Sequence, residues 1–548
     1  MYVFCNSLLK LCKGFFVDNK YFYFFPVLVT FMKRKTLLLC LLSVIVMVLI
    51  LKLSTTLLVE PWLEKRLETL FNEKSEKYQL EVGHIHLRFL SSEIKLDSLL
   101  LINKVDNDRK LSGRVTAVRI QGINLFRLLF QKNIAIRKLS ISEISIFGQL
   151  PHSEKKALPQ IMPMNLRIGR IVLKKIDFGL EEPALTKAYN LQSGALIMYD
   201  LKIEKRDTLS IRLIKRVDFK ADGFQTLSKD SMYTYKLKGV DYKCKPGKLS
   251  VKEVVIHPNY SKKRFAELHR FATDRMDGRF SNIVAGGFSV EDLIKSKRLG
   301  SSGIEVDSLN LIIFRDNRIE KRHVVKPVFQ EMIYHCPVSL NLDSIHVKNG
   351  DITYVERVPQ ANHQGSICFN QINATLYNIT NDTRYKKRNV SLILKGTALL
   401  MGKGRFNVLL KAKLYDRLNT FTVKANLSHI SASSLNPLLS NNVFMRIASG
   451  EIESMNFFFT ANDLKAKGSM CLLYHDLKIA VLNKETDKSN ALKERFLSMV
   501  LNFKILNSNP LLGKEVRVGK IEYDRNPEKF LFSYCVKSIV SGIQTSIL

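Results

Sequence analysis

The chain has 548 residues, which is too long for one compact core of usual size. Since 46% of the residues are hydrophobic, general disorder is excluded. Its 85 Lys and Arg outnumber 50 Asp and Glu and give a net charge of +35. A charge this basic favours an anionic partner, either a nucleic acid or the anionic face of a membrane; the alternative is that the charges only solvate a large surface.

Residues 32–59 predict a transmembrane helix. Basic residues at 33–35 precede a charge-free run that ends at Leu51, and Lys52 is followed by further apolar residues. A helix needs about 20 residues to cross a hydrocarbon core, and the basic end is expected to stay in the cytoplasm. Since no small-residue cleavage site follows, we expect an uncleaved anchor; the alternative is a buried core helix.

Residues 1–31 are apolar and aromatic, but charged residues interrupt them. The basic cluster after Met32 has the composition of an ordinary start of a membrane anchor. We therefore expect Met32 to be the true initiator and residues 1–31 to be a non-native extension. The alternative is a second membrane-associated segment.

Residues 60–78 predict an amphipathic helix. Pro61 suits a first helical turn. Leu63, Leu67 and Leu70 recur at helical spacing with Glu and Lys between them. We expect this helix to cover the start of the exported body.

From residue 80 onward, apolar residues alternate with polar ones, as in strands with one apolar and one wet face. The clearest run covers residues 406–414, and it repeats at 421–427 after a turn at 416–419. Helices are expected at 261–276 and at about 530–548. The predicted fold class is mainly β: an N-terminal transmembrane helix followed by an elongated, curved antiparallel β-sheet or groove with a few short amphipathic helices.

Two pairs of segments are weakly similar to each other. Residues 193–203 resemble residues 467–479, and residues 170–178 resemble residues 344–352. We interpret each segment as a strand, a turn and a strand, which would make a repeating β-unit. Chance similarity between alternating strands is the alternative.

The sequence contains no G-x-S-x-G elbow, P-loop, H-E-x-x-H or G-x-G-x-x-G motif. His84 and His86 have the spacing of two metal ligands on one face of a strand, but no Cys or carboxylate accompanies them in pattern. Asp316 lies among arginines, where a turn-stabilising ion pair is a better interpretation than catalysis. The 8 cysteines have no C-x-x-C pair, which predicts isolated buried thiols. We predict no catalytic residue, no cofactor and no metal site.

A sheet with one apolar face must bury that face against a second sheet, inside a closed barrel, or against an apolar ligand. A membrane anchor favours the third option, because it brings the sheet to acyl chains. The alternative is an ordinary sandwich core. The candidate lipid-facing residues are Phe406, Val408, Leu410, Leu414, Phe421 and Val423.

A series of short motifs occurs in a fixed order along the chain. They cover residues 61–63, 115–125, 134–141, 258–265, 314–318, 343–354, 435–438, 448–452, 468–477, 507–510, 519–525 and 537–543. On these residues the chain resembles the AsmA-like family of membrane-anchored bacterial envelope proteins, in the form found in Bacteroidetes. That family is similar in overall design to the bridge-like lipid-transfer proteins, in which an elongated β-groove carries lipid between membranes.

The resemblance implies an N-terminal helix and β region at 60–160, a middle β-rich region at 161–335 and a C-terminal β region with a terminal amphipathic helix at 336–548. It implies a non-enzymatic, single-pass protein of the bacterial inner membrane with a cytoplasmic N-terminus and a periplasmic body. It further implies a lipid-binding groove and a role in outer-membrane biogenesis, lipid transport or lipid homeostasis. The expected partners are membrane phospholipid or glycolipid and other envelope proteins. No nucleic acid is expected, since zinc-finger, basic-zipper and RNA-recognition signatures are missing from the sequence.

The rival hypothesis is an envelope scaffold or assembly factor that binds proteins through exposed strand edges. A continuous apolar trough open to solvent would favour the lipid function, whereas a filled sandwich with polar edges would favour the scaffold. A third hypothesis, a hydrolase that acts on envelope polymers, is not supported, because the sequence contains no paired acid and base motif.

Overall fold

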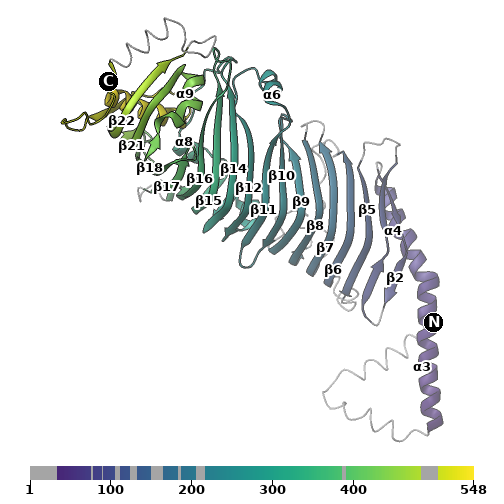
Figure 1. The fold of residues 1–548 in the computed structure, drawn as a ribbon. Helices are drawn as coiled ribbons and strands as arrows, with labels where there is room; N and C mark the ends of the chain where they lie inside the picture. Colours follow the sequence, from purple (N-terminus) through teal and green to yellow (C-terminus); the bar gives the residue numbers. More distant parts are fainter. Residues whose placement is uncertain are drawn as a thin grey trace, which may run out of the picture.

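The computed structural model is one curved sheet that a long helix leads into (Figure 1). It describes residues 34–75, 78–88, 91–104, 111–123, 133–149, 165–182, 187–204, 216–384, 390–482 and 504–548. The predicted mainly-β class is confirmed, because 23 strands belong to a single sheet. The long helix lies at one end of this sheet and the C-terminus lies at the other. The extension predicted at 1–31 lies outside the described residues.

The described helical segments are α3 (Arg34–Ser54), the π-helix η2 (Thr55–Val59), α4 (Glu60–Lys74), α6 (Lys262–Leu268), α7 (Val290–Ser296), α8 (Phe329–Tyr334), the 3₁₀ helix η6 (Ala432–Leu435), α9 (Asn436–Asn442) and α11 (Leu531–Ile547). The helix predicted at about 530–548 is confirmed as α11. The helix predicted at 60–78 is confirmed as α4, although it ends at Lys74 and Tyr78 begins the first strand.

The segment Leu38–Glu73, which runs through α3, η2 and α4, is a 36-residue helix long and apolar enough to cross a membrane. Its side chains in α3 are exposed, with 68% of Leu38 and 63% of Ile50 accessible. Because the protein does not bury these side chains, they need an apolar environment from outside. The helix is therefore consistent with a single-pass membrane anchor and not with a core helix.

The strands, in chain order, are β1 (Tyr78–Val82), β2 (Ile85–Arg88), β3 (Glu93–Leu96), β4 (Leu99–Asn103), β5 (Ser112–Ile123), β6 (Asn133–Gln149), β7 (Asn165–Glu182), β8 (Lys187–Ile203), β9 (Arg216–Leu227), β10 (Tyr233–Lys243), β11 (Lys248–Pro258), β12 (Arg275–Gly286), β13 (Arg298–Ser301), β14 (Gly303–Asp316), β15 (Ser339–Arg357), β16 (Gly365–Thr380), β17 (Ser391–Leu400), β18 (Gly404–Lys413), β19 (Phe421–Leu427), β20 (Ile430–Ser431), β21 (Met445–Ala461), β22 (Lys465–Val481) and β23 (Val518–Asp524).

Most strands that follow one another in sequence are antiparallel neighbours in the sheet, as in the run β7 to β12. Two places differ from the expected antiparallel pattern. β6 pairs with β7 in parallel, and β14 pairs with β15 in parallel, with the short β13 also parallel to β15. Parallel neighbours require the chain to cross back between them. After β14 it does so through residues 317–338, which include α8.

A line of β-bulges crosses the sheet roughly perpendicular to the strands, and we call it the bulge line. Its members with positive φ, between 49° and 60°, are Glu143, Lys175, Ser193, Gly239, Asn282, Asn349 and Gln371. In β10, β11 and β12 the cross-strand register skips Gly239, Lys252 and Asn282, which lie at the same level. A bulge adds one residue to a strand and bends it. Bulges at one level in successive strands therefore bend the whole sheet along one line.

Two local predictions are wrong in detail. The helix predicted at 261–276 begins after Ser261, whose hydroxyl accepts a hydrogen bond from the Arg264 N–H, but it ends at Leu268. Met276 instead pairs with Ile313 in the sheet, and this pairing overrides the local helical pattern. The similar segments 170–178 and 344–352, and likewise 193–203 and 467–479, are not strand, turn and strand, because each lies within one long strand. In 170–178 and 344–352 the apparent turn is a bulge.

The sheet also runs through both predicted region boundaries. The boundary at 335/336 lies in the connection between the parallel strands β14 and β15, whose pairing continues the sheet. The boundary at 160/161 lies outside the described residues, but the strands on either side of it, β6 and β7, are paired.

Candidate functional site

One face of the sheet is lined by apolar side chains, and we call it the apolar face. In the middle of the sheet it contains the cross-strand row Phe224, Leu237, Val254, Phe280 and the row Ala221, Val240, Val251, Ile283. The rows lie on either side of the bulge line. Since the bulge adds one residue, the apolar positions step by three there, as from Leu237 to Val240, and both rows stay on the same face.

The opposite face carries the charges of the same strands. Glu253 accepts contacts from Lys238 at 2.6 Å and from Arg279 at 3.3 Å, and the Lys220 ammonium lies 2.8 Å from Asp241. The hydrogen bond from Lys238 holds the pKa of Glu253 below its ordinary value. The sheet is therefore amphipathic as a whole, with ion pairs on its wet side.

No second layer of described structure packs broadly on the apolar face in the middle of the sheet. Each of β8 to β11 packs extensively only against its neighbours within the sheet. The row Phe224, Leu237, Val254, Phe280 remains partly exposed, whereas Ala221, Val240 and Val251 of the other row are buried among side chains of the sheet itself. The middle of the apolar face is thus formed but not covered by the described residues.

At the N-terminal end, α4 runs along the edge formed by β1 and β2. The backbone N–H groups of Leu87, Ile85, Val82 and Leu80 donate to side-chain oxygens of Glu60, Glu64, Glu68 and Asn72, in this order, at 2.7–2.8 Å. Four helical residues rise about 6 Å, close to the ~6.8 Å spanned by two strand residues. The acidic face of α4 therefore matches the edge of the sheet and closes it.

We expect Glu64→Ala to destabilise this end of the sheet by roughly 1–3 kcal/mol, because the Ile85 N–H loses a charged acceptor. Hydrogen exchange at Ile85, followed by mass spectrometry, would accelerate accordingly. Glu73→Ala is the matched control, since Glu73 lies on the same helix and outside this set of bonds. Equal exchange in the two variants would contradict the assignment.

At the C-terminal end, α11 closes the other edge. The N–H groups of Lys520 and Glu522 on β23 donate to the hydroxyls of Thr545 at 2.8 Å and Ser541 at 3.1 Å. The helix lies very close to the strand, since a Cβ on Gly519 would come within 2.3 Å of the carbonyl oxygen of Gly542. Glycine at both positions allows this contact.

The same helix covers the apolar face at this end. Its buried residues Leu531 and Tyr534 belong to a core cluster with strands β17 to β23, and Cys535, Ile539 and Ile543 pack against it. Burial raises the pKa of the Cys535 thiol to about 12. Together with α8, α11 fills the C-terminal end of the sheet, so the part of the apolar face that the described residues leave uncovered is its middle.

The six predicted lipid-facing residues lie in this filled part. All six belong to the core cluster or pack against it, and the strand residues among them share the apolar face. Leu410, Leu414, Phe421 and Val423 are between 2% and 7% exposed, whereas Phe406 and Val408 are partly buried. A charge at Leu410 would therefore unfold the core before it could report on a ligand. The residues suited to meet a ligand are their equivalents farther along the same face, such as Leu237 and Val254.

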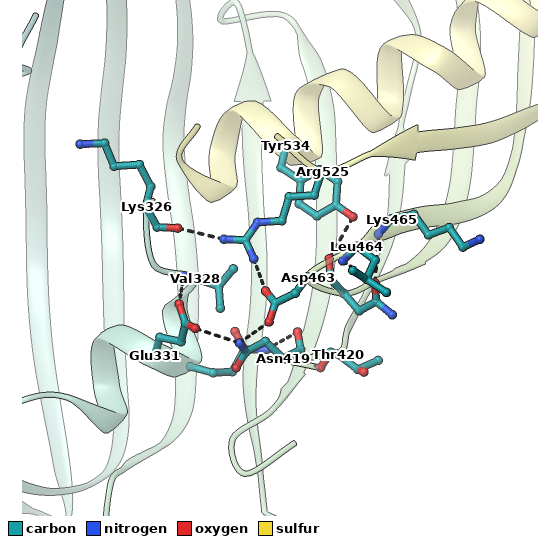
Figure 2. Close-up of polar contacts among 12 residues, drawn as sticks. Lys326, Val328, Glu331, Asn419, Thr420, Asp463, Leu464, Lys465, Arg525 and Tyr534 are labelled. Carbon is teal, nitrogen blue, oxygen red and sulfur yellow. Dashed lines mark hydrogen bonds and ion pairs between the residues drawn. The ribbon is translucent and has the colours of Figure 1, made fainter. Parts of the chain in front are cut away.

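A polar network joins the loops around α11 (Figure 2). The Arg525 guanidinium pairs with the Asp463 carboxylate and donates to the carbonyl oxygen of Lys326 at 2.9 Å. The Asn419 amide donates to Asp463 at 2.7 Å and to Glu331 of α8 at 3.2 Å. Arg525, Asp463 and Glu331 thus each have a partner. The Tyr534 hydroxyl of α11 donates to the carbonyl oxygen of Asn462, next to Asp463, at 3.1 Å, so the network holds α8 and α11 over the apolar face.

The remaining predicted polar positions have structural environments. His84 is not on a strand but in the loop before β2, and the His86 ring nitrogen Nε2 lies 2.9 Å from Asp97. The predicted ion pair of Asp316 is confirmed, with Arg318 at 2.6 Å, and the hydrogen bond from Arg318 lowers the pKa of Asp316. The described cysteines are unpaired, but the prediction of buried thiols is wrong for them: Cys40 in α3 is exposed, and Cys244, Cys336, Cys368, Cys471 and Cys535 are only partly buried.

No protein-family model matches this chain, and no curated protein matches it significantly. Its described residues form an amphipathic curved sheet that helices close at both edges, with an apolar face left uncovered in the middle and an apolar helix at one end.

Proposed function

We propose that this protein is a non-enzymatic, membrane-anchored lipid-binding protein whose apolar sheet face holds acyl chains. The observation that carries the proposal is the uncovered apolar face in the middle of the sheet, continuous with the filled face around α11. Such a face needs an apolar occupant, and each buried methylene contributes about 0.8 kcal/mol.

The anchor supplies the source of that occupant. The helix Leu38–Glu73 runs directly into the edge of the sheet, and Leu63 packs against the cluster of Ile85, Leu96 and Val118 on the apolar face. The N-terminal end of the face therefore lies beside the membrane that holds the anchor. A lipid that moves from bilayer to sheet exchanges one apolar environment for another, so the transfer needs no exposure of its tails to water.

In the cell, we place the body of the protein in the periplasm of a bacterium, with the N-terminus in the cytoplasm and the anchor in the inner membrane. The basic residues at 33–35 support this orientation. The proposed process is lipid transport, lipid homeostasis or outer-membrane biogenesis, for which the resemblance to AsmA-like proteins is the support. Phospholipid or glycolipid is the proposed ligand.

The rival scaffold function has less support. It needs free strand edges for added strands, but α4 occupies the edge at β1 and β2, and α11 occupies the edge at β23. Closed edges prevent addition of a foreign strand while leaving the face between them accessible.

The proposal is tested by lipid mass spectrometry on the full chain purified in mild detergent. We expect phospholipid or glycolipid at one or more molecules per protein, retained through gel filtration. A well-folded preparation without lipid would overturn the proposal, and crosslinking for a protein partner would then follow.

A further inference from the structure

Between β9 and β16 the apolar face carries charged residues at one place, near the filled C-terminal end. Ile313 of β14 and Tyr354 of β15 are paired on this face. Arg315 and Glu356, which lie two residues farther along the same strands, are also paired and point to the same face. Asp274 precedes β12 and faces Arg315, with Nη1 and Oδ1 3.2 Å apart. These groups mark the point near the ends of β14 and β15 where the apolar lining of these two strands stops.

Three lysines from two segments lie near this point: Lys321 and Lys326 follow β14, and Lys529 precedes α11. The Arg315 guanidinium lies 5.9 Å and the Lys326 ammonium 5.0 Å from the centre of the Phe530 ring, so the two cations share one aromatic side chain. Figure 2 shows the Lys326 side chain extending away from the Arg525 network, which its backbone carbonyl joins. Lys321 follows Glu320, whose carbonyl oxygen accepts from the Ala272 N–H at 2.8 Å, and the Ala272 carbonyl oxygen lies 3.5 Å from Arg315. Lys529 directly precedes Phe530. Burial lowers the pKa of Lys529, and the nearby charges of Lys321 and Arg315 lower it further.

Two acids act on these cations, Asp274 on Arg315 and Glu356 on Lys529, and both already have partners. Asp274 is paired with Arg315. Glu356 accepts hydrogen bonds from the side chains of Asn317 and, at 3.3 Å, Asn442. Within the described residues, no acid forms an ion pair with Lys321, Lys326 or Lys529. We call these three lysines and Arg315 the cationic cluster.

We propose that the cationic cluster binds the phosphate of an anionic lipid headgroup, with the acyl chains of that lipid lying on the uncovered apolar face toward β9. This inference rests on the proposed lipid-binding function and adds the headgroup class and the position of the lipid. A phosphate matches the site because lysine ammonium groups bind phosphate as point charges, and unpaired cations that repel one another gain most from an anion. The adjacent apolar rows then receive the tails.

The test uses the full chain in detergent micelles and native mass spectrometry with two probes, phosphatidylglycerol and phosphatidylcholine of identical acyl chains. The variant Lys321→Gln with Lys529→Gln removes two cations that have no acid partner in the described structure. The matched control, Lys252→Gln with Lys424→Gln, removes the same charge from exposed positions elsewhere in the sheet. Glycerol phosphate, which lacks tails, is added as a competitor.

We expect the wild type to prefer phosphatidylglycerol by about tenfold, the variant to lose this preference while it still binds phosphatidylcholine, and the control to keep it. We also expect the variant to melt at the same or a higher temperature, because repulsion between lysines is relieved; a merely structural role would lower it. Displacement of the lipid by millimolar glycerol phosphate would overturn the lipid assignment, and an unchanged preference in the variant would overturn the site alone. Failure of the wild type to bind either lipid would overturn the proposed function and the inference with it.

Discussion

The variant Leu237→Asp with Ile283→Asp is expected to lose at least about tenfold of the lipid that co-purifies with the wild type. The two side chains lie in different rows of the uncovered apolar face, on either side of the bulge line. An acyl chain that covers them would remove two carboxylates from water, which costs several kcal/mol for each charge without a partner.

The variant should still fold, because both positions are partly exposed and no described element packs over them. Circular dichroism and the melting temperature would test this. The control is Val255→Asp with Gln225→Asp on the opposite face, where both residues pair with Lys236 and lipid content should not change. Unchanged lipid in a folded Leu237→Asp, Ile283→Asp variant would be incompatible with tails on this face.

The variant Arg525→Ala is expected to destabilise the C-terminal end of the sheet by roughly 3–5 kcal/mol, the usual cost of breaking a buried ion pair from one side. The Arg525 side chain is only 5% exposed, and its loss leaves the Asp463 carboxylate without a counter-charge and the carbonyl oxygen of Lys326 without a donor, although Asn419 still donates to Asp463. Hydrogen exchange in α11 and β23 should rise by about a hundredfold or more.

A double variant separates the cost of the unpaired Asp463 carboxylate from the other effects of losing Arg525. Adding Asp463→Ala to Arg525→Ala should recover part of the lost stability, because the unpaired carboxylate is removed as well. Lys520→Ala is the control, since the Lys520 ammonium is exposed and its contact with Glu522 is worth about 1 kcal/mol or less. If Arg525→Ala behaved like this control, α11 would be held by apolar packing alone.

The bend of the sheet has a signal in the sequence that alternation alone does not reveal. Val251 and Val254, and likewise Phe280 and Ile283, are apolar at a spacing of three where a strand repeats every two. A single three-residue step of this kind is easily interpreted as an irregularity or a turn, as at residues 170–178. It indicates a bulge only when neighbouring strands show the same step at the same level, and that alignment depends on their register.

The closed edge at α4 also has a signal. Glu60, Glu64 and Glu68 recur every four residues, which places them on one helical face. In the sequence this reads as the solvated side of an amphipathic helix. Its role as a row of acceptors appears only when the edge of β1 and β2 lies beside it, because strand N–H groups and helix carboxylates share nearly the same spacing.

The sequence by itself determined the apolar helix, the mainly-β class and which face of each strand is apolar, because run length and period-two alternation are local properties of the chain. Only the tertiary structure decided which part of the apolar face is covered. Leu410 and Leu237 have the same alternating pattern, yet Leu410 is 7% exposed and Leu237 remains only partly buried. The difference comes from the core cluster that β15 to β23 form with α8 and with α11, which lies more than a hundred residues beyond Leu410 in the chain; in the described structure this cluster fills one end of the face and not the middle.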